Sequence, residues 1–206
     1  MAARTPRKPS SAPAPSRSAT VRAASAKGAA PSNAAPAKAA RARRGIVSSS
    51  HLVSERSMEL SEFEFGLIVA WNAFSRWAMR CMAAAGCPDL TITDVLVLHH
   101  INHRARNKKL ADICFVLNYE DTHVVAYSLK KLLVAGLAQG DKQGKEVFYS
   151  PTAAGEAAVA KYREVRETCL IDNLDADQNA DIGAMARLLR TMSGLYDQAA
   201  RAATSL

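Results

Sequence analysis

The chain has 206 residues and a formal net charge of +8, with 27 lysines and arginines against 19 aspartates and glutamates. Residues 1–54 hold ten of the basic residues and no acidic residue, so residues 55–206 carry a net charge of −2. The positive net charge of the whole chain therefore does not by itself indicate a nucleic-acid partner. Such a partner requires a basic surface in the folded part. The apolar runs are far shorter than the roughly 18 residues that span a bilayer.

Residues 1–54 consist mainly of Ala, Pro, Ser, Lys and Arg, with almost no large apolar side chains. Such a segment buries too little surface to offset its chain entropy, so we expect a disordered tail. Two roles remain open: a polycationic arm that associates with phosphate, or a solubilising extension. An organellar transit peptide is disfavoured because the repeated prolines break an amphipathic helix.

Residues 55–85 place apolar side chains at alternating steps of three and four, which predicts a long helix. Further apolar residues widen this stripe beyond one face, as in a helix that is buried from two sides. In a chain of this size the second side favours a partner subunit. Gly86 and Pro88 are typical of a helix end.

Two shorter helices follow. The first begins near Thr91 or Thr93, either of which is a suitable N-cap, and Asp94 in its first turn favours the helix dipole. The helical pattern ends in the basic connector "RARNKK". The second lies in "KKLADICFVLN", where Asn118 is a suitable left-handed end.

A fourth helix is predicted from Thr122 to Ala135, with Asp121 as its N-cap and Gly136 at its end. At 100° per residue its side chains divide into two faces. The apolar face holds Val125, Leu129, Leu132 and Leu133, and the opposite face holds His123, Tyr127, Lys130, Lys131 and Val134.

The period then changes from that of a helix to that of strands. Leu137 to Gly140 and Lys145 to Ser150 read as two strands joined by a tight turn in "DKQG". A fifth helix opens at Thr152. Asp177 is the expected cap of a sixth, whose apolar stripe consists of Ile182, Met185, Leu188, Leu189, Met192, Leu195 and Tyr196.

The fold class that follows is mainly α with a small β-hairpin: a winged helix-turn-helix domain over residues 55–206, with a core at about 91–151 and helices on both sides. Residues 99–145 carry a net charge of +4, which leaves −6 for the rest of the ordered part. The positive charge thus gathers in the unit that would contact phosphate.

Within this unit, "KKLADICFVLNYEDTHVVAYSLKKLLVAGLAQGDKQGKEVFYSPTAAGE" resembles the core of MarR-type winged-helix transcriptional regulators, with "LLVAGL" and "TAAG" at the expected places. The resemblance covers about residues 55–203. It implies a homodimer formed by the terminal helices, double-stranded DNA as partner, and a small-molecule effector pocket between the dimerisation helices and the DNA-binding lobe. One departure is clear: the family's wing carries Asp-x-Arg, whereas Asp141 is followed at that spacing by Gln143.

These observations predict a sequence-specific regulator of the repressor type that places the fourth helix in the major groove. An architectural, nucleoid-type protein of low specificity remains the alternative. The predicted DNA-binding residues are Thr122, His123, Tyr127, Lys130, Lys131, Lys108, Lys109, Arg104, Lys142 and Lys145. The candidate effector pocket is lined by Trp71, Trp77, His99 and His103.

Other chemistries find less support. His99 and His103 have the i, i+4 spacing of metal ligands, but they share a face with apolar residues, so packed histidines are favoured and neither metal nor cofactor is expected. The four cysteines form no CxxC pair and are expected to be buried, reduced thiols. No catalytic motif is present, so we expect no enzyme but a cytoplasmic, nucleoid-associated protein.

Overall fold

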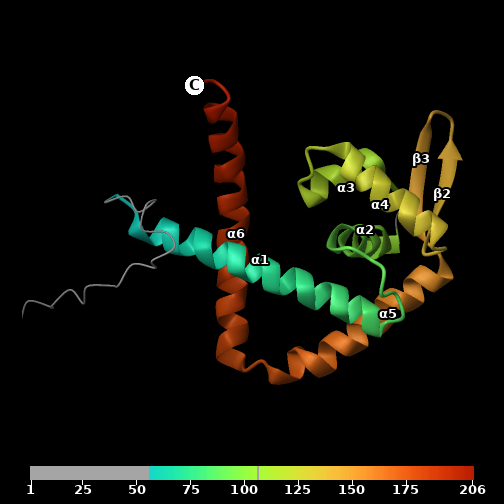
Figure 1. Cartoon of the computed structure of the whole chain (residues 1–206), viewed down its shortest axis with the longest axis horizontal. Helices are drawn as coiled ribbons and strands as arrows, with labels where there is room; N and C mark the ends of the chain where they lie inside the picture. Colours follow the sequence, from blue (N-terminus) through green and yellow to red (C-terminus); the bar gives the residue numbers. More distant parts are fainter. Residues whose placement is uncertain (1–55, 106) are drawn as a thin grey trace, which may run out of the picture. The chain divides into compact units, whose positions relative to one another are not determined.

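The computed structural model describes residues 56–105 and 107–206, so the tail predicted for residues 1–54 lies outside the described part. Figure 1 follows the elements along the chain. They are α1 (Met58–Ala84), α2 (Ile92–Asn102), a 3-10 turn η2 (His103–Ala105), β1 (Lys108–Lys109), α3 (Leu110–Leu117), α4 (Thr122–Val134), β2 (Ala138–Gln143), β3 (Glu146–Pro151), α5 (Ala153–Cys169), a 3-10 turn η3 (Ile171–Asn173) and α6 (Ala176–Ala203). The predicted fold class, mainly α with a small β-hairpin, is confirmed, and a third strand, β1, joins the hairpin.

The central helix α2 packs against α1, α4 and α5. Its start is fixed by Thr91, whose side chain accepts from the backbone N–H of Asp94, while the Asp94 carboxylate accepts in return from the backbone N–H of Thr91. This reciprocal capping box decides between the two predicted caps. Thr93 instead shares a hydrogen bond with the hydroxyl of Tyr119, 3.1 Å away.

The helix pair α3–α4 has nearly the predicted boundaries, since α4 ends at Val134, one residue before the predicted end. Asn118 ends α3 with φ of 56°, in the left-handed region, and the Asp121 carboxylate caps α4 by accepting from the backbone N–H of His123. Val125, Leu129 and Leu132 are fully buried, as expected from the apolar face. The prediction was wrong for Leu133, which lies at the edge of that face and is exposed.

The sheet has three antiparallel strands in the order β1–β3–β2. The sequence did not predict β1, which pairs Lys108 with Tyr149. It also placed the hairpin turn too early. Asp141 is paired within β2, and the turn consists of Gly144 and the residue after it, since Gln143 pairs with Glu146. Gly144 has φ of 63°, which a two-residue hairpin turn needs and a glycine adopts without strain.

The start of α5 is hydrogen-bonded to the segment that leads into the hairpin. The Thr152 hydroxyl accepts from the N–H of Gly155 and donates to the carbonyl of Gly136, 2.6 Å away. A Cβ atom at Gly155 would lie 2.0 Å from the Leu137 carbonyl oxygen, so only glycine fits there. The glycine of "TAAG" is therefore a close-packing residue.

The last helix, α6, begins at a different cap from the predicted one. Asp175 and Gln178 form a reciprocal capping box, and Asp177 lies inside the first turn. None of the side chains of α6 is buried. The Tyr196 hydroxyl, which donates to Glu64 of α1, is one of its few ties to the rest of the chain. Among residues 56–105 and 107–206, no helix has the length and apolar character to cross a membrane.

Candidate nucleic-acid interface

The outward face of α4 carries most of the predicted base-contacting side chains. Thr122, His123, Tyr127 and Lys130 are all exposed, and Tyr127 is 71% exposed although it is a large aromatic residue. At this exposure the Tyr127 ring is not buried against a neighbouring helix of the same chain. The helix is held by its opposite face, so these four side chains are free to meet a ligand.

Lys131, the next residue along α4, has an internal role instead. It is half-buried, and its ammonium lies 2.8 Å from Oδ2 of Asp94 and 2.6 Å from the carbonyl oxygen of Asp89. The Ser128 hydroxyl donates to the other oxygen of Asp94 at 2.6 Å. Burial by itself raises the pKa of the Asp94 carboxyl, but the hydrogen bonds from Lys131, Ser128 and Thr91 outweigh burial and hold that pKa below its usual value. The Asp94 carboxylate thus links the start of α2 to α4.

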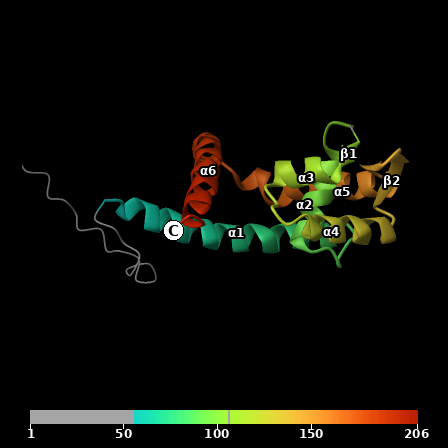
Figure 2. The same cartoon turned by 90° about the horizontal axis from the view of Figure 1, so that it is seen from above.

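The three basic residues near β1 also differ from the prediction of a shared DNA-facing surface. Lys108 is only 8% exposed, and its ammonium donates to the carbonyl oxygens of Ile101 and His103 at the end of α2. Lys109 forms an ion pair with Glu146, 2.6 Å away, and lies over the ring of Phe148. These contacts bind the ammonium groups within the protein. Arg104 is exposed in the turn before β1, which Figure 2 shows on the opposite side of the lobe from α4.

The hairpin β2–β3 presents two exposed lysines, Lys142 and Lys145. The side-chain amide of Gln143 donates to the Asp141 carboxylate at 2.7 Å, so the position that corresponds to the family's wing arginine is occupied by a neutral group bonded to its neighbour. Residues 138–151 contain no arginine. The lysines therefore provide the positive charge of the hairpin.

The four predicted effector-pocket residues are not brought together by either of two cavities in the described part of the chain. His99 lines a cavity of about 390 Å³ between α1, α2 and α5, together with Phe74, Tyr162 and Arg166. His103 lines another, and neither tryptophan lines either one: Trp71 stacks at a tilt on Phe74 with ring centroids 6.0 Å apart, and Trp77 packs against the core. A single pocket lined by all four residues stays a prediction.

His99 is a core-packed histidine. Its ring meets the edge of Tyr162 at a centroid distance of 4.4 Å, and its Nε2 atom is buried with no hydrogen-bond partner in the described part of the chain. Burial lowers the pKa of the His99 imidazole, which keeps the ring neutral near neutral pH. Within residues 56–105 and 107–206, no group of three or more His, Cys, Asp or Glu side chains is arranged to hold a metal ion.

The cysteines follow the prediction in part. Cys81 and Cys114 are buried, Cys87 is half-buried, and all three have a raised pKa with burial as its main cause. A raised pKa disfavours the reactive thiolate. Cys169 is exposed at the end of α5, so the expectation that every thiol is buried was wrong there. An amphipathic helix end has a solvent side, which the apolar neighbourhood in the sequence did not indicate.

The family model of a winged helix DNA-binding domain matches residues 90–155, the segment that runs from the start of α2 to the start of α5. Residues 90–155 form a winged helix DNA-binding domain. The winged-helix fold that the predicted resemblance implies is thereby confirmed, with α3 and α4 as the helix-turn-helix, α4 as its second helix and β2–β3 as the wing.

Solved structures have the same fold. A MarR family transcription regulator is 14% identical and matches with a TM-score of 0.55 over 69% of this chain and 95% of its own. AbfR of Staphylococcus epidermidis is 17% identical, with a TM-score of 0.55 over 66% and 92% of the two chains. FabT of Streptococcus pneumoniae, solved in complex with DNA, is 14% identical, with a TM-score of 0.53 over 66% and 99%. At these identities the likeness establishes the fold. No curated protein matches the chain in sequence.

Sequence reasoning missed the buried network that supports the winged helix. Asp94 was assigned only to the helix dipole, and Ser128 was not singled out. One signal was available: Ser128 and Lys131 are three residues apart on α4, so both reach the same side of it. The acid that they share was not identifiable, because it lies more than 30 residues earlier in the chain.

Proposed function

We propose that the protein is a sequence-specific, DNA-binding transcriptional regulator that acts as a homodimer and places α4 in the major groove. The observation that carries this proposal is the division of α4 into a fully buried face and an exposed polar face, within a winged helix. A helix-turn-helix uses this arrangement to present side chains to base edges while its other face is fixed by the core. The FabT structure, which contains DNA, has the same fold.

The proposed DNA-binding residues fall into two groups, those suited to base edges and those suited to phosphate oxygens. Thr122, His123 and Tyr127 are near the start of α4 and carry groups that hydrogen-bond or pack against base edges and adjacent phosphates. Three exposed lysines suit phosphate oxygens: Lys130, Lys142 and Lys145. We leave Lys108, Lys109 and Lys131 out of the interface, because their ammonium groups already bind carbonyl or carboxylate oxygens.

Homodimerisation is supported by the long outer helices. The apolar stripe of α6 is exposed in the single chain, as are several large apolar residues of α1. Monomeric proteins rarely expose contiguous apolar patches of this kind, so a second copy of the chain is the natural cover. A two-fold dimer would present two α4 helices to half-sites about one turn of DNA apart, and the operator is then expected to be an inverted repeat.

A second function, that of an architectural protein of low sequence specificity, is favoured by one observation. The wing carries lysines and no arginine. A lysine ammonium is strongly hydrated and lacks the planar fork of a guanidinium, so it is a poorer probe of the narrow minor groove. Its contribution to affinity is electrostatic and shared by all sequences.

The experiment that separates the two functions measures the ratio of affinities for selected and bulk DNA. Genome-wide DNA capture with the full-length protein provides the selected sites, and titrations at one stated salt concentration provide the dissociation constants. A specific regulator is expected to prefer its site by about 10³-fold or more. A ratio near one would contradict the regulator and support the architectural protein.

A small-molecule effector is also part of the proposal, with a changed site. Of the four residues predicted from the sequence, the cavity keeps His99, and it adds Phe74, Tyr162 and Arg166, which combine apolar rings with a cation there. It lies where α1, α2 and α5 meet, so a ligand in it would contact helices of both the proposed dimer interface and the DNA-binding lobe.

A further inference from the structure

Two apolar side chains are exposed in the first two turns of α4. They are Val124 and Tyr127, and because they are three residues apart they are neighbours on the helix surface. An exposed valine gains nothing from burial and has a lower helix propensity than alanine, so the pair adds nothing to the stability of a purely solvated face. We call Val124 and Tyr127 the apolar pair of α4.

The same helix lacks the side chains that read purines best. Residues 122–134 contain no arginine, asparagine or glutamine, the residue types that bond guanine or adenine through two parallel hydrogen bonds. A lysine can also bond guanine, but Lys131 is bound to Asp94, which leaves Lys130 in the third turn. The residues nearest the base edges are those at the start of a recognition helix, so Lys130 is better placed for phosphate.

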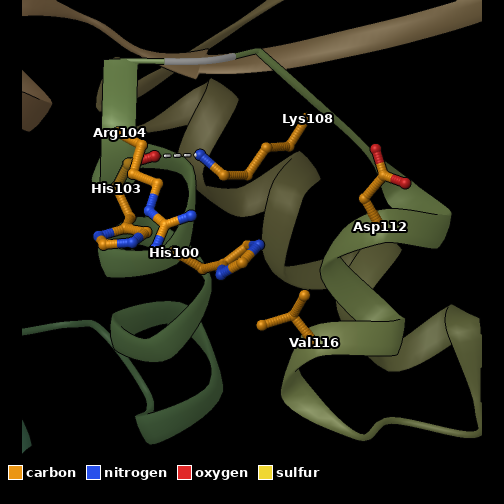
Figure 3. A pocket seen from close by; sticks show the side chains of 6 residues that line it. All are labelled: His100, His103, Arg104, Lys108, Asp112 and Val116. Atoms are coloured by element: carbon orange, nitrogen blue, oxygen red, sulfur yellow. Dashed lines mark hydrogen bonds between the residues drawn. The ribbon is translucent and has the colours of Figure 1, made fainter.

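The arginines of the winged helix are elsewhere. Residues 90–155 contain two, Arg104 and Arg106, and both precede β1. Arg106 is outside the described part of the chain. Arg104 lies on the opposite side of the lobe from α4 (Figure 2), and its side chain points toward the imidazoles of His100 and His103 (Figure 3). No arginine of this domain is therefore on α4 or on the wing.

The amide side chains of α3, α4 and the wing are already hydrogen-bonded. Residues 110–151 contain three of them, and Asn118, Gln139 and Gln143 each donate to a side-chain oxygen of the same chain. The groups that remain at the start of α4 are the apolar pair and the two polar residues Thr122 and His123.

The major groove presents one apolar group to such a surface. It is the 5-methyl group of thymine, since the other base edges consist of hydrogen-bond donors and acceptors. An aromatic ring and the methyl groups of a valine remove a methyl group from water on contact. The gain for one methyl-sized group corresponds to a factor of roughly four in affinity.

We propose that the apolar pair reads thymine: the ring of Tyr127 and the methyl groups of Val124 pack against 5-methyl groups in each half-site of the operator. These contacts, rather than paired hydrogen bonds to purines, then carry most of the sequence preference. The proposal rests on the proposed function, because it requires α4 to enter the major groove.

The test replaces thymine by uracil, which lacks the 5-methyl group and keeps the pairing atoms. The fragment that the full-length protein binds most tightly in genome-wide capture is synthesised in both forms and titrated at one stated salt concentration. The readout is the ratio of the dissociation constants of the uracil and thymine forms. We expect a ratio of about four for one methyl contact, and roughly fifteen for one contact in each half-site of a dimer.

Three variants assign the ratio to the apolar pair. Val124→Ala combined with Tyr127→Ala is expected to bring the ratio below about two, because the contacts to the methyl groups are lost. Tyr127→Phe keeps the ring and loses only the hydroxyl, so it should keep the ratio of the unaltered protein. Lys130→Ala is the matched control on the same helix: it should weaken both forms by the same factor, since a phosphate contact does not sense the methyl group. Far-UV circular dichroism checks that each variant is folded.

Failure of this proposal is distinct from failure of the proposed function. Equal affinity for the thymine and uracil forms of a fragment that is preferred over bulk DNA would overturn the thymine reading and leave the regulator intact. A thymine preference that persists in the double alanine variant would assign the discrimination to other groups, and it would also overturn the proposal. A fragment with no preference over bulk DNA contradicts the proposed function, and the uracil comparison on that same fragment still decides for or against the apolar pair.

Discussion

The Nζ atom of Lys131 lies 2.8 Å from Oδ2 of Asp94, so a lysine on the helix proposed to enter DNA is bound to the buried start of α2. Asp94 is 1% exposed and accepts hydrogen bonds from Thr91, Ser128 and Lys131. A buried carboxylate needs all of these partners to offset its lost hydration. This one acid therefore fixes the position of α4 relative to α2, and its removal provides the first prediction.

We expect Asp94→Ala to lower the free energy of unfolding by about 3 kcal/mol, because it removes a helix cap and a buried partner of Ser128 and Lys131 together. The matched control is Asp112→Ala. Asp112 has the same place in the first turn of α3 and accepts from the backbone of Lys109, but it is exposed, so a loss of about 1 kcal/mol or less is expected. Urea denaturation at fixed protein concentration measures both. Equal losses for the two variants would show that the buried network adds nothing to the cap.

The same carboxylate predicts a pH dependence. Its pKa in the folded protein is below the usual 3.8, so its contribution to stability is fully present above the unfolded value and is lost as the pH falls through the folded value. We therefore expect the stability difference between the unaltered protein and Asp94→Asn to be constant from pH 7 to pH 5 and to shrink below about pH 4. Denaturation at a series of pH values checks this. A difference that persists unchanged at pH 3 would contradict the assigned direction.

The features that were predicted from the sequence are those that short segments determine. Asn118 and Asp121 could be assigned because a left-handed helix end and an N-cap depend on one or two residues and their neighbours. β1 could not be predicted, since two lysines become a strand only by pairing with Tyr149 and Phe148 about 40 residues later. The choice of Asp175 over Asp177 follows from Gln178, which completes the capping box from the third helical position.

The candidate site was harder to predict than the fold. The helical period put Lys131 on the polar face of α4, but Lys131 is half-buried and lies on the same side of the helix as Ser128, from which its long side chain reaches Asp94. The basic connector "RARNKK" predicts that Lys108 is a surface residue. Its ammonium instead donates hydrogen bonds to carbonyl groups at the end of α2. Charge counted along the sequence does not show which charges are already paired, and this determines which of them remain for DNA.

Gly155, at the start of α5, is expected to respond to Gly→Ala with a change in stability opposite in sign to the usual one. Gly→Ala inside a helix usually stabilises by about 1 kcal/mol. At Gly155 the new Cβ would meet the Leu137 carbonyl oxygen at 2.0 Å, so we expect Gly155→Ala to destabilise by more than about 2 kcal/mol as the hairpin is pushed from α5. Gly183→Ala, in α6, meets nothing within 4 Å and is the control with the usual sign. Thermal and urea denaturation measure both, and stabilisation by Gly155→Ala would contradict the close contact.

The exposed stripe of α6 provides the test of the dimer. We expect the double variant Met185→Asp, Leu188→Asp to sediment at the mass of one chain where the unaltered protein sediments at twice that mass, because two unpaired charges would be buried in each half of the interface. Arg190→Asp introduces an acid on the opposite side of α6 and should leave the dimer intact. Analytical ultracentrifugation distinguishes these outcomes. A double variant that remains dimeric would exclude this stripe from the interface.

The neighbouring lysines of α4 separate DNA contact from support of the fold. Lys130 is exposed and has no ion-pair partner in the described part of the chain, whereas Lys131 is bound to Asp94. We expect Lys130→Ala to leave the free energy of unfolding within about 0.5 kcal/mol and to weaken DNA binding for all sequences, with the slope of log K against log salt reduced by about one. Lys131→Ala is expected to lower stability by about 2 kcal/mol because it leaves the Asp94 charge unpaired.

The complementary change is at the predicted base-contacting residues. His123→Ala together with Tyr127→Ala should reduce the affinity for the selected site more than for bulk DNA, since base contacts carry the sequence information and phosphate contacts do not. Both side chains are exposed and lie outside α1 and α6, so the mass in ultracentrifugation should be unchanged. Titrations of selected and bulk DNA at one salt concentration measure the ratio. If Lys130→Ala leaves the salt slope unaltered and the double variant leaves the ratio unaltered, then α4 is not the helix that enters the major groove.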